Sequence, residues 1–150
     1  MNVFVYGTLK RGFGNSVHLQ GSQFMGIAET VARYPLFVDM YAVSYMVDDE
    51  GFTGSERVVG EMFLVNDKTM NRLDILEGVA QGRYIRKQIS VEASDGERLT
   101  AAAYMLPKMA HGLRLESRTL IEEYSAEVHE KFVPPENRDA SRMASWGGFE

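Results

Sequence analysis

The sequence contains no cysteine. Disulfides, a thiol nucleophile and zinc held by thiolates are therefore excluded for this chain. No serine lies in a nucleophile-elbow pattern, and neither a P-loop nor a dinucleotide fingerprint is present. The histidines lie far apart and lack the paired spacing of a metal site: His18, His111 and His129. We expect neither a metal site nor a cofactor.

Long apolar runs and concentrated positive charge are also missing. No apolar run approaches the ~20 residues that span a bilayer. The first residues lack the basic start and apolar core of a signal peptide, so we expect cytoplasmic residence and no membrane partner. The formal charge of −5 is spread along the chain, and the pair Lys10-Arg11 is too small a basic footprint for nucleic acid.

The remaining composition is that of an ordinary globular protein, with 45% hydrophobic and 25% charged residues. The chain shows no internal repeat and no linker, so its 150 residues predict one domain over 1–150. A polar tail begins near Pro134. We expect residues 134–150 to wrap the surface or to be partly disordered. The oligomeric state is left open.

Strand signals dominate the pattern of expected elements. Runs of β-branched and aromatic residues predict about six strands, within residues 3–6, 24–30, 41–47, 58–65, 84–93 and 99–106, and a further extended piece over residues 34–38. Helices are predicted in three places: a short one from Asn15-Ser16, one capped by Asn66 or Asp67 that ends at Gly78, and one over residues 117–132. This pattern predicts an α+β fold with a mainly antiparallel, barrel-like sheet.

The N-terminal stretch 3–12 combines a strand with a glycine-bounded loop. Four strand-forming residues end at Gly7, where glycine allows backbone torsions that other residues resist, and Gly12 closes the loop. A strand that stops abruptly leaves the next backbone N–H groups without ladder partners. A small anionic ligand is one candidate partner for these groups, and a plain tight turn is the alternative.

Glu77 is the most informative side chain in the sequence. On a helix, Met70, Leu73 and Leu76 form an apolar stripe, with Glu77 roughly 40° from its centre and Asp74 roughly 100° away. Burial and a position in the last helical turn both raise the pKa of the Glu77 carboxyl toward neutrality. Such a carboxyl can give and take protons near pH 7. The alternative is an acid at a frayed helix end that reaches water.

Two further candidates, Tyr84 and Arg86, follow Glu77 closely. Because they are two residues apart, a strand would place them on one face. An arginine near Glu77 would lower the pKa of its carboxyl, so the distance between them matters. An ordinary cross-strand pair is the alternative for both.

Five motifs in a fixed order resemble the γ-glutamylcyclotransferase-like family. They are VFVYGTLKRG at 3–12, YPL at 34–36, VGEMF at 59–63, LDILE at 73–77 and YIR at 84–86. The similarity covers roughly residues 3–106 and is closest to the family's γ-glutamylamine cyclotransferase branch. The sequence departs from the family in residues 78–83 and in residues 39–54. These two segments are expected to border the leaving-group side of the site.

The resemblance implies a small mixed β-barrel with flanking helices and no cofactor. It also implies release of 5-oxoproline by attack of the substrate's α-amine on its own γ-carbonyl. By position, Glu77 would be the acid/base. Four loop residues would bind the glutamyl part, mainly through backbone N–H groups to its α-carboxylate: Tyr6, Gly7, Thr8 and Leu9. Tyr84 and Arg86 would build or position the wall of the site.

The function expected from these residues is therefore a cyclotransferase for γ-glutamyl amines, such as γ-glutamyl-ε-lysine. A γ-glutamyl amino acid or peptide substrate is the alternative within the same class. From a different class, a non-catalytic binding module would keep the pocket without turnover. A purely structural domain would leave the pairing of the loop with Glu77 unexplained.

Overall fold

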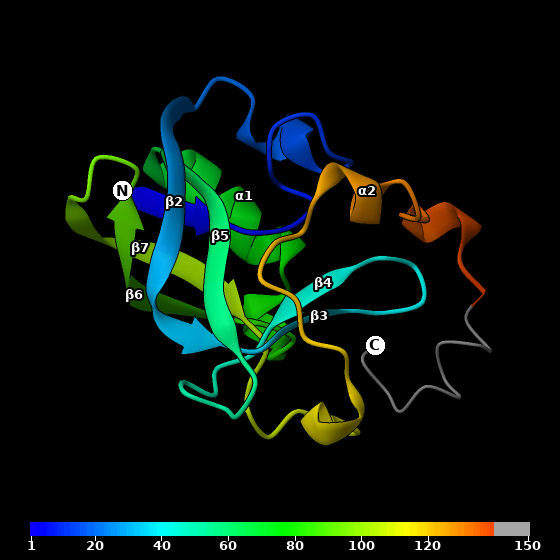
Figure 1. The fold of residues 1–150 in the computed structure, drawn as a ribbon. Coiled ribbons are helices and arrows are strands. Elements are labelled where there is room, and N and C mark those ends of the chain that lie inside the picture. Colours follow the sequence, from blue (N-terminus) through cyan, green and yellow to red (C-terminus); the bar gives the residue numbers. More distant parts are fainter. Residues whose placement is uncertain (140–150) are drawn as a thin grey trace.

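Five strands close into a barrel in the computed structural model, which describes residues 1–139. Around the barrel the strand order is β1 (Asn2–Val5), β5 (Glu56–Leu64), β2 (Gln23–Tyr34), β6 (Ile85–Ala93) and β7 (Arg98–Met105). Neighbouring strands pair antiparallel, except that β1 and β7 close the barrel in parallel, with Val3 opposite Ala102. The predicted α+β fold with a mainly antiparallel barrel is confirmed (Figure 1).

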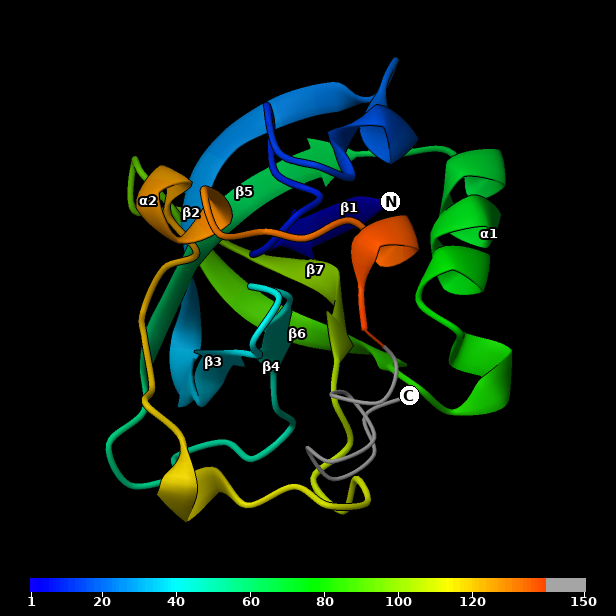
Figure 2. The same cartoon turned by 90° about the vertical axis from the view of Figure 1, so that its right-hand side faces the viewer.

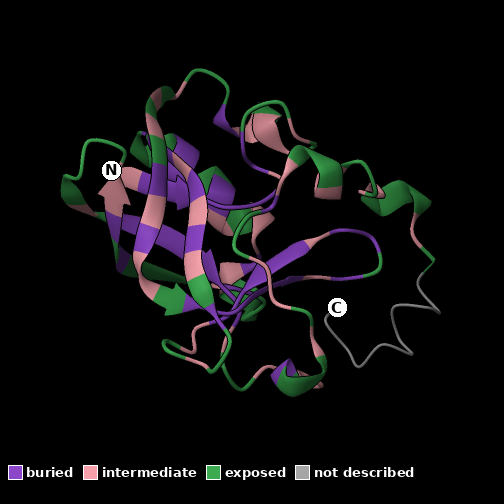
Figure 3. Ribbon diagram, viewed as in Figure 1, coloured by how far each residue is buried: buried purple, intermediate pink, exposed green. Residues whose placement is uncertain are grey.

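Alternating residues explain why β1 and β7 are apolar on both faces. Phe4 packs with the buried side chains of the barrel interior, whereas Val3 and Val5 belong to the cluster that includes α1 (Asp67–Leu76). Successive side chains of a strand point to opposite faces, so a strand covered on both sides needs apolar residues throughout. Figure 3 shows this burial along the strands, and Figure 2 shows α1 outside the barrel.

Residues 58–65, most of which form β5, are nearly all apolar, yet only one face of the strand is regularly buried. Its burial alternates: Val58, Gly60 and Met62 are buried, whereas Val59 and Glu61 between them are partly exposed. One face of β5 therefore lies inside the barrel, and the other is partly open to solvent. Gly60 permits this packing, because a Cβ there would lie 2.7 Å from the Cζ atom of Phe4.

The remaining elements are one two-stranded hairpin and several short helical segments. Strands β3 (Leu36–Val38) and β4 (Ser44–Met46) form a separate antiparallel hairpin. The short helical segments are η1 (Ser16–Leu19), η2 (Val79–Gln81), η3 (Leu115–Ser117), α2 (Ala126–His129) and η4 (Pro135–Asn137). The prediction of a capped helix is confirmed, with Asn66 as its cap: the Asn66 side chain accepts a hydrogen bond from the Thr69 N–H (2.8 Å).

The predicted helix over residues 117–132 is wrong. Ile121 donates its N–H to the Leu36 carbonyl, and the Glu122 carbonyl accepts from Val59, both at 2.8 Å, so this segment runs extended along existing strands. Only α2 is α-helical there, starting where the Ser125 hydroxyl accepts from a backbone N–H. Among the apolar residues at helical spacing, Tyr124 is fully buried, and Leu120 and Ile121 pack against the core in part.

Candidate active site

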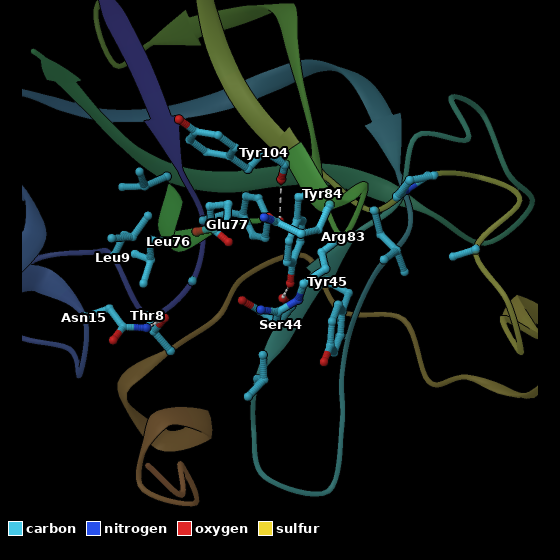
Figure 4. Close-up of a pocket in the computed structure, with 18 of the residues that line it drawn as sticks. Thr8, Leu9, Asn15, Ser44, Tyr45, Leu76, Glu77, Arg83, Tyr84 and Tyr104 are labelled. Atoms are coloured by element: carbon cyan, nitrogen blue, oxygen red, sulfur yellow. Dashed lines mark hydrogen bonds between the residues drawn. The ribbon is translucent and has the colours of Figure 1, made fainter. Parts of the chain in front are cut away.

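A cavity of about 640 Å³ lies beside the end of β1. Its walls come from the turn after β1, strand β4, residues 76–84 between α1 and β6, and parts of residues 104–111 and 132–138. Figure 4 shows these segments converging on Glu77. The cavity brings together six of the seven residues expected from the sequence: Tyr6, Gly7, Thr8, Leu9, Glu77 and Tyr84.

The turn after β1 presents two unused backbone donors. Lys10 donates its N–H to the Gly7 carbonyl at 3.0 Å, which closes a turn with Thr8 and Leu9 at its centre. Within residues 1–139, the N–H groups of Thr8 and Leu9 donate no hydrogen bond. Asn15 steadies the turn, because its side-chain amide donates to the Thr8 hydroxyl at 2.8 Å. Two free amides in a held turn suit an anionic group.

Gly7 is needed for space, which corrects the reason inferred from the sequence. Its φ is not among the positive values that favour glycine. A Cβ at Gly7 would instead overlap the Ser44 hydroxyl of β4. The glycine therefore lets the β3–β4 hairpin approach the turn and close one side of the cavity.

Buried tyrosines form the frame of the cavity. The Tyr6 hydroxyl donates to the Tyr104 carbonyl at 2.6 Å, and the Tyr84 hydroxyl donates to the Ser44 carbonyl at 3.2 Å. Tyr84 also stacks on Tyr45, with ring centres 6.1 Å apart and an interplanar angle of 6°. Burial raises the pKa of Tyr6 and of Tyr84 well above the ordinary value, so both stay protonated. Their hydrogen bonds join the segments that form the walls of the cavity.

Glu77 is the residue that directly follows α1. Its backbone N–H donates to the Leu73 carbonyl at 2.9 Å, which fixes where the side chain leaves the helix. The residue keeps some exposed surface at the cavity, yet protein surrounds the carboxyl on most sides. Burial raises the pKa of Glu77 to about 7, against a smaller lowering by Arg83. The expected direction of this pKa shift is confirmed, with burial as its cause.

The arginine that acts on Glu77 is Arg83, and Arg86 lies elsewhere. Arg86 is not among the residues that line the cavity. It pairs with Asp74 at 2.9 Å, and Asp74 also accepts from the Tyr104 hydroxyl at 2.7 Å. The expectation that Tyr84 and Arg86 share a strand face is wrong, because β6 begins at Ile85: Tyr84 is buried before the strand, whereas Arg86 is exposed within it.

Several lining residues were not singled out from the sequence. Ser44 and Tyr45 lie in the segment expected to border the site, and so does Arg83, but no pattern marked them individually. Pro135 and Arg138 lie in the tail expected to wrap the surface or be disordered, yet both line the cavity. The other part of that prediction, residues 140–150, lies outside the described residues.

Residues 1–139 offer neither a cluster of metal ligands nor a membrane-spanning helix. In that range no group of three or more histidine, aspartate or glutamate side chains could hold a metal ion. Over the same residues no helix combines the length and apolar character required to cross a membrane.

The cavity beside the barrel brings the Glu77 carboxyl, whose pKa is raised by burial, together with the turn that carries the free amides of Thr8 and Leu9. A family model described as gamma-glutamyl cyclotransferase, AIG2-like, matches residues 3–126. The chain therefore belongs to this family. Membership supports an enzyme of the gamma-glutamyl cyclotransferase class and implies a small gamma-glutamyl substrate.

Individual relatives agree with the family assignment. A provisionally named gamma-glutamylcyclotransferase of Methanocaldococcus jannaschii is 35% identical over 116 residues, covering 77% of this chain and 91% of that protein. Gamma-glutamylaminecyclotransferase B of Danio rerio is 36% identical over 81 residues, covering 50% of this chain and 41% of that protein. A provisionally named gamma-glutamylcyclotransferase of Arabidopsis thaliana is 39% identical over 99 residues, 62% of this chain, and the match spans about half (52%) of that relative.

The fold likeness extends to solved structures. The crystal structure of an AIG2-like protein from Mus musculus superposes with a TM-score of 0.78 at 26% identity. The likeness covers 91% of this chain and 97% of the mouse chain. The five-stranded barrel with its flanking helices is therefore the fold of this family.

Proposed function

We propose that this protein is a cyclotransferase that releases 5-oxoproline and a free amine from γ-glutamyl amines, such as γ-glutamyl-ε-lysine. The observation that carries the proposal is a carboxyl with a pKa of about 7, Glu77, in the same cavity as the free amides of Thr8 and Leu9. The naming of the Danio rerio relative supports the amine substrate.

The turn after β1 binds the glutamyl part in this mechanism. The N–H groups of Thr8 and Leu9 donate to the α-carboxylate, and Gly7 gives the backbone its close approach to β4. Tyr6 fixes the start of the turn through its bond to β7. The substrate is thereby folded so that its α-amine lies near its own γ-carbonyl. Because nucleophile and electrophile belong to one molecule, positioning supplies much of the rate.

Glu77 moves the proton. Its carboxylate takes one proton from the α-ammonium, and the freed amine attacks the γ-carbonyl carbon. As the new C–N bond forms, Glu77 passes the proton to the departing nitrogen and the old C–N bond breaks. The attacking nitrogen gives up two protons in all, and the released amine leaves as an ammonium. A pKa near the working pH suits both steps, because each protonation state is populated.

Tyr84 and Arg86 have supporting roles in the proposal. Tyr84 forms the wall beside Glu77 and keeps its proton. Arg86 acts from outside the cavity, through its pair with Asp74 on α1. Neither transfers a proton.

Product release by two variants tests the assignment. The protein is incubated with γ-glutamyl-ε-lysine and with a γ-glutamyl dipeptide, and 5-oxoproline is measured. We expect Glu77→Gln to lower the rate by about 10²–10⁴-fold, the range of a lost acid/base. Glu97→Gln is the matched control, since Glu97 is exposed in the turn between β6 and β7 and lies outside the cavity.

Each alternative has its own outcome in this experiment. Faster turnover of the dipeptide would show that γ-glutamyl amino acids or peptides are the preferred substrates. Saturable binding with no 5-oxoproline from either substrate would make the protein a binding module. Release by Glu77→Gln at the native rate would show that another group moves the proton.

A further inference from the structure

Two arginines from distant segments line the same cavity. Arg83 lies between η2 and β6, and Arg138 follows η4. Within residues 1–139 neither guanidinium pairs with a carboxylate. Arg57 and Arg86, outside the cavity, do have such partners. Arg83 and Arg138 therefore present unpaired positive charge to whatever fills the cavity.

Both side chains are held in place on the Tyr45 side. The stem of Arg83 packs over Gly78, where an added Cβ would lie 2.8 Å from its Cδ atom. Arg138 donates its Nε–H to the Val133 carbonyl at 2.8 Å, which leaves its Nη atoms without a hydrogen-bond partner among the described residues. Each guanidinium lowers the pKa of Tyr45 against the rise caused by burial, so both lie near that hydroxyl. Figure 4 shows Arg83 close to Glu77 and Tyr45.

The charge of the cavity exceeds what the glutamyl part requires. Among the residues that the structure describes, its lining contains one carboxylate, Glu77, and two guanidiniums, although the whole chain carries −5. In the proposed function the amides of Thr8 and Leu9 already hold the glutamyl α-carboxylate. The positive charge therefore faces the other part of the substrate, the departing amine. Guanidinium groups match carboxylates in charge and in geometry.

We propose that the leaving amine carries a carboxylate, and that Arg83 and Arg138 bind it. The inference rests on the proposed function and narrows its substrate class: an amine that is itself an amino acid is preferred over a plain alkylamine. In γ-glutamyl-ε-lysine the carboxylate lies at the far end of the lysine chain, and in a γ-glutamyl dipeptide it lies next to the scissile bond.

Two pairs of substrates that differ only by this carboxylate test the inference. One pair is γ-glutamyl-ε-lysine and γ-glutamyl-cadaverine; the other is γ-glutamyl-alanine and γ-glutamyl-ethylamide. The readout is the ratio of kcat/KM within each pair, from 5-oxoproline release. For at least one pair we expect the native protein to favour the carboxylate about 10- to 100-fold, the range for hydrogen bonds to a charged group.

Arg83→Gln and Arg138→Gln should each reduce that ratio toward one. The ratio is insensitive to the folded fraction, because a loss of folded protein affects the two substrates of a pair alike. Arg72→Gln is the control, since Arg72 is exposed on α1 outside the cavity and should keep the native ratio.

Other results would overturn the inference in distinguishable ways. A native ratio of one for both pairs would show that the protein does not recognise a carboxylate on the leaving amine. An equal loss for both members of a pair in the arginine variants would place these side chains on the glutamyl part. If a variant keeps the native ratio, the arginine that it replaces does not bind the substrate's carboxylate. If the native protein releases no 5-oxoproline from any of the four compounds, the proposed function itself is refuted.

Discussion

Replacing Glu77 by glutamine should stabilise the protein, and the gain should depend on pH. Burial raises the pKa of Glu77 from 4.5 to about 7 in the folded state. An acid whose pKa is raised by folding opposes folding once it ionises. Below pH 4.5, the pKa of the group in the unfolded chain, Glu77 is neutral in both states and does not destabilise the fold. The destabilisation grows as the pH rises to about 7, the pKa in the folded state. A shift of this size corresponds to about 3 kcal/mol above neutral pH.

That value is an upper bound, because Glu77 keeps some contact with solvent at the cavity. Glutamine has nearly the same shape and remains neutral, so Glu77→Gln removes the charge and keeps the packing. We expect the free energy of unfolding of the variant to exceed the native value by about 2–3 kcal/mol at pH 8. The difference should disappear near pH 4.5, the ordinary pKa of the group.

Urea denaturation of both proteins at steps between pH 4.5 and pH 8 measures the difference directly. Asp74→Asn serves as the control, because it removes a carboxylate that pairs with Arg86 at 2.9 Å and should not stabilise the fold. A stability difference between Glu77→Gln and the native protein that stays constant across this range would refute the buried-carboxyl reasoning, whatever its effect on activity.

Three further predictions follow from the same geometry. Gly7→Ala should destabilise the protein by about 1–3 kcal/mol and abolish 5-oxoproline release, because its Cβ overlaps the Ser44 hydroxyl; Ser44→Gly should restore both in the double variant. Release should increase as the pH rises through about 7, and Arg83→Gln should move the midpoint upward, since Arg83 lowers the pKa of Glu77; an unmoved midpoint in the pH–rate profile would contradict this. Burial lowers the pKa of His129, whose Nε2 accepts a backbone hydrogen bond, so thermal stability should fall as the pH drops below 6.5, and less so in His129→Gln.

Local sequence signals predicted the structure correctly where neighbouring residues determine it. The stop of β1 at its turn depends on neighbouring residues, and so does the cap of α1 by Asn66. The near-core position of Glu77 followed from helix geometry alone, because three apolar residues define the buried side of one short helix. The barrel followed from the number and order of the strands.

The predictions failed where contacts between residues far apart in the sequence determine the structure. Residues 117–132 carry apolar residues at helical spacing, but the edge of the β3 strand offers a backbone acceptor to Ile121, and an extended chain uses it. The reason for glycine at position 7 lies in Ser44, which is 37 residues away in the chain. Arg86 was singled out because the spacing rule assumed a strand that begins at Tyr84, one residue before β6 begins, and no pattern marked Arg83. None of these contacts can be predicted from the local spacing of apolar and polar residues.

The position of Arg83 explains why the pKa of Glu77 lies near 7 and not near either extreme. Without a cation nearby, burial alone would raise the pKa further, and the carboxyl would rarely ionise to accept a proton. At ion-pair distance an arginine would hold the carboxylate ionised and unable to donate. Within residues 1–139 Arg83 forms no salt bridge with Glu77, so the two groups interact from beyond 4.0 Å. If Arg83 also binds the substrate's carboxylate, its charge is partly neutralised in the complex. The pKa of Glu77 then rises on binding, which favours proton donation to the departing amine when the substrate is in place.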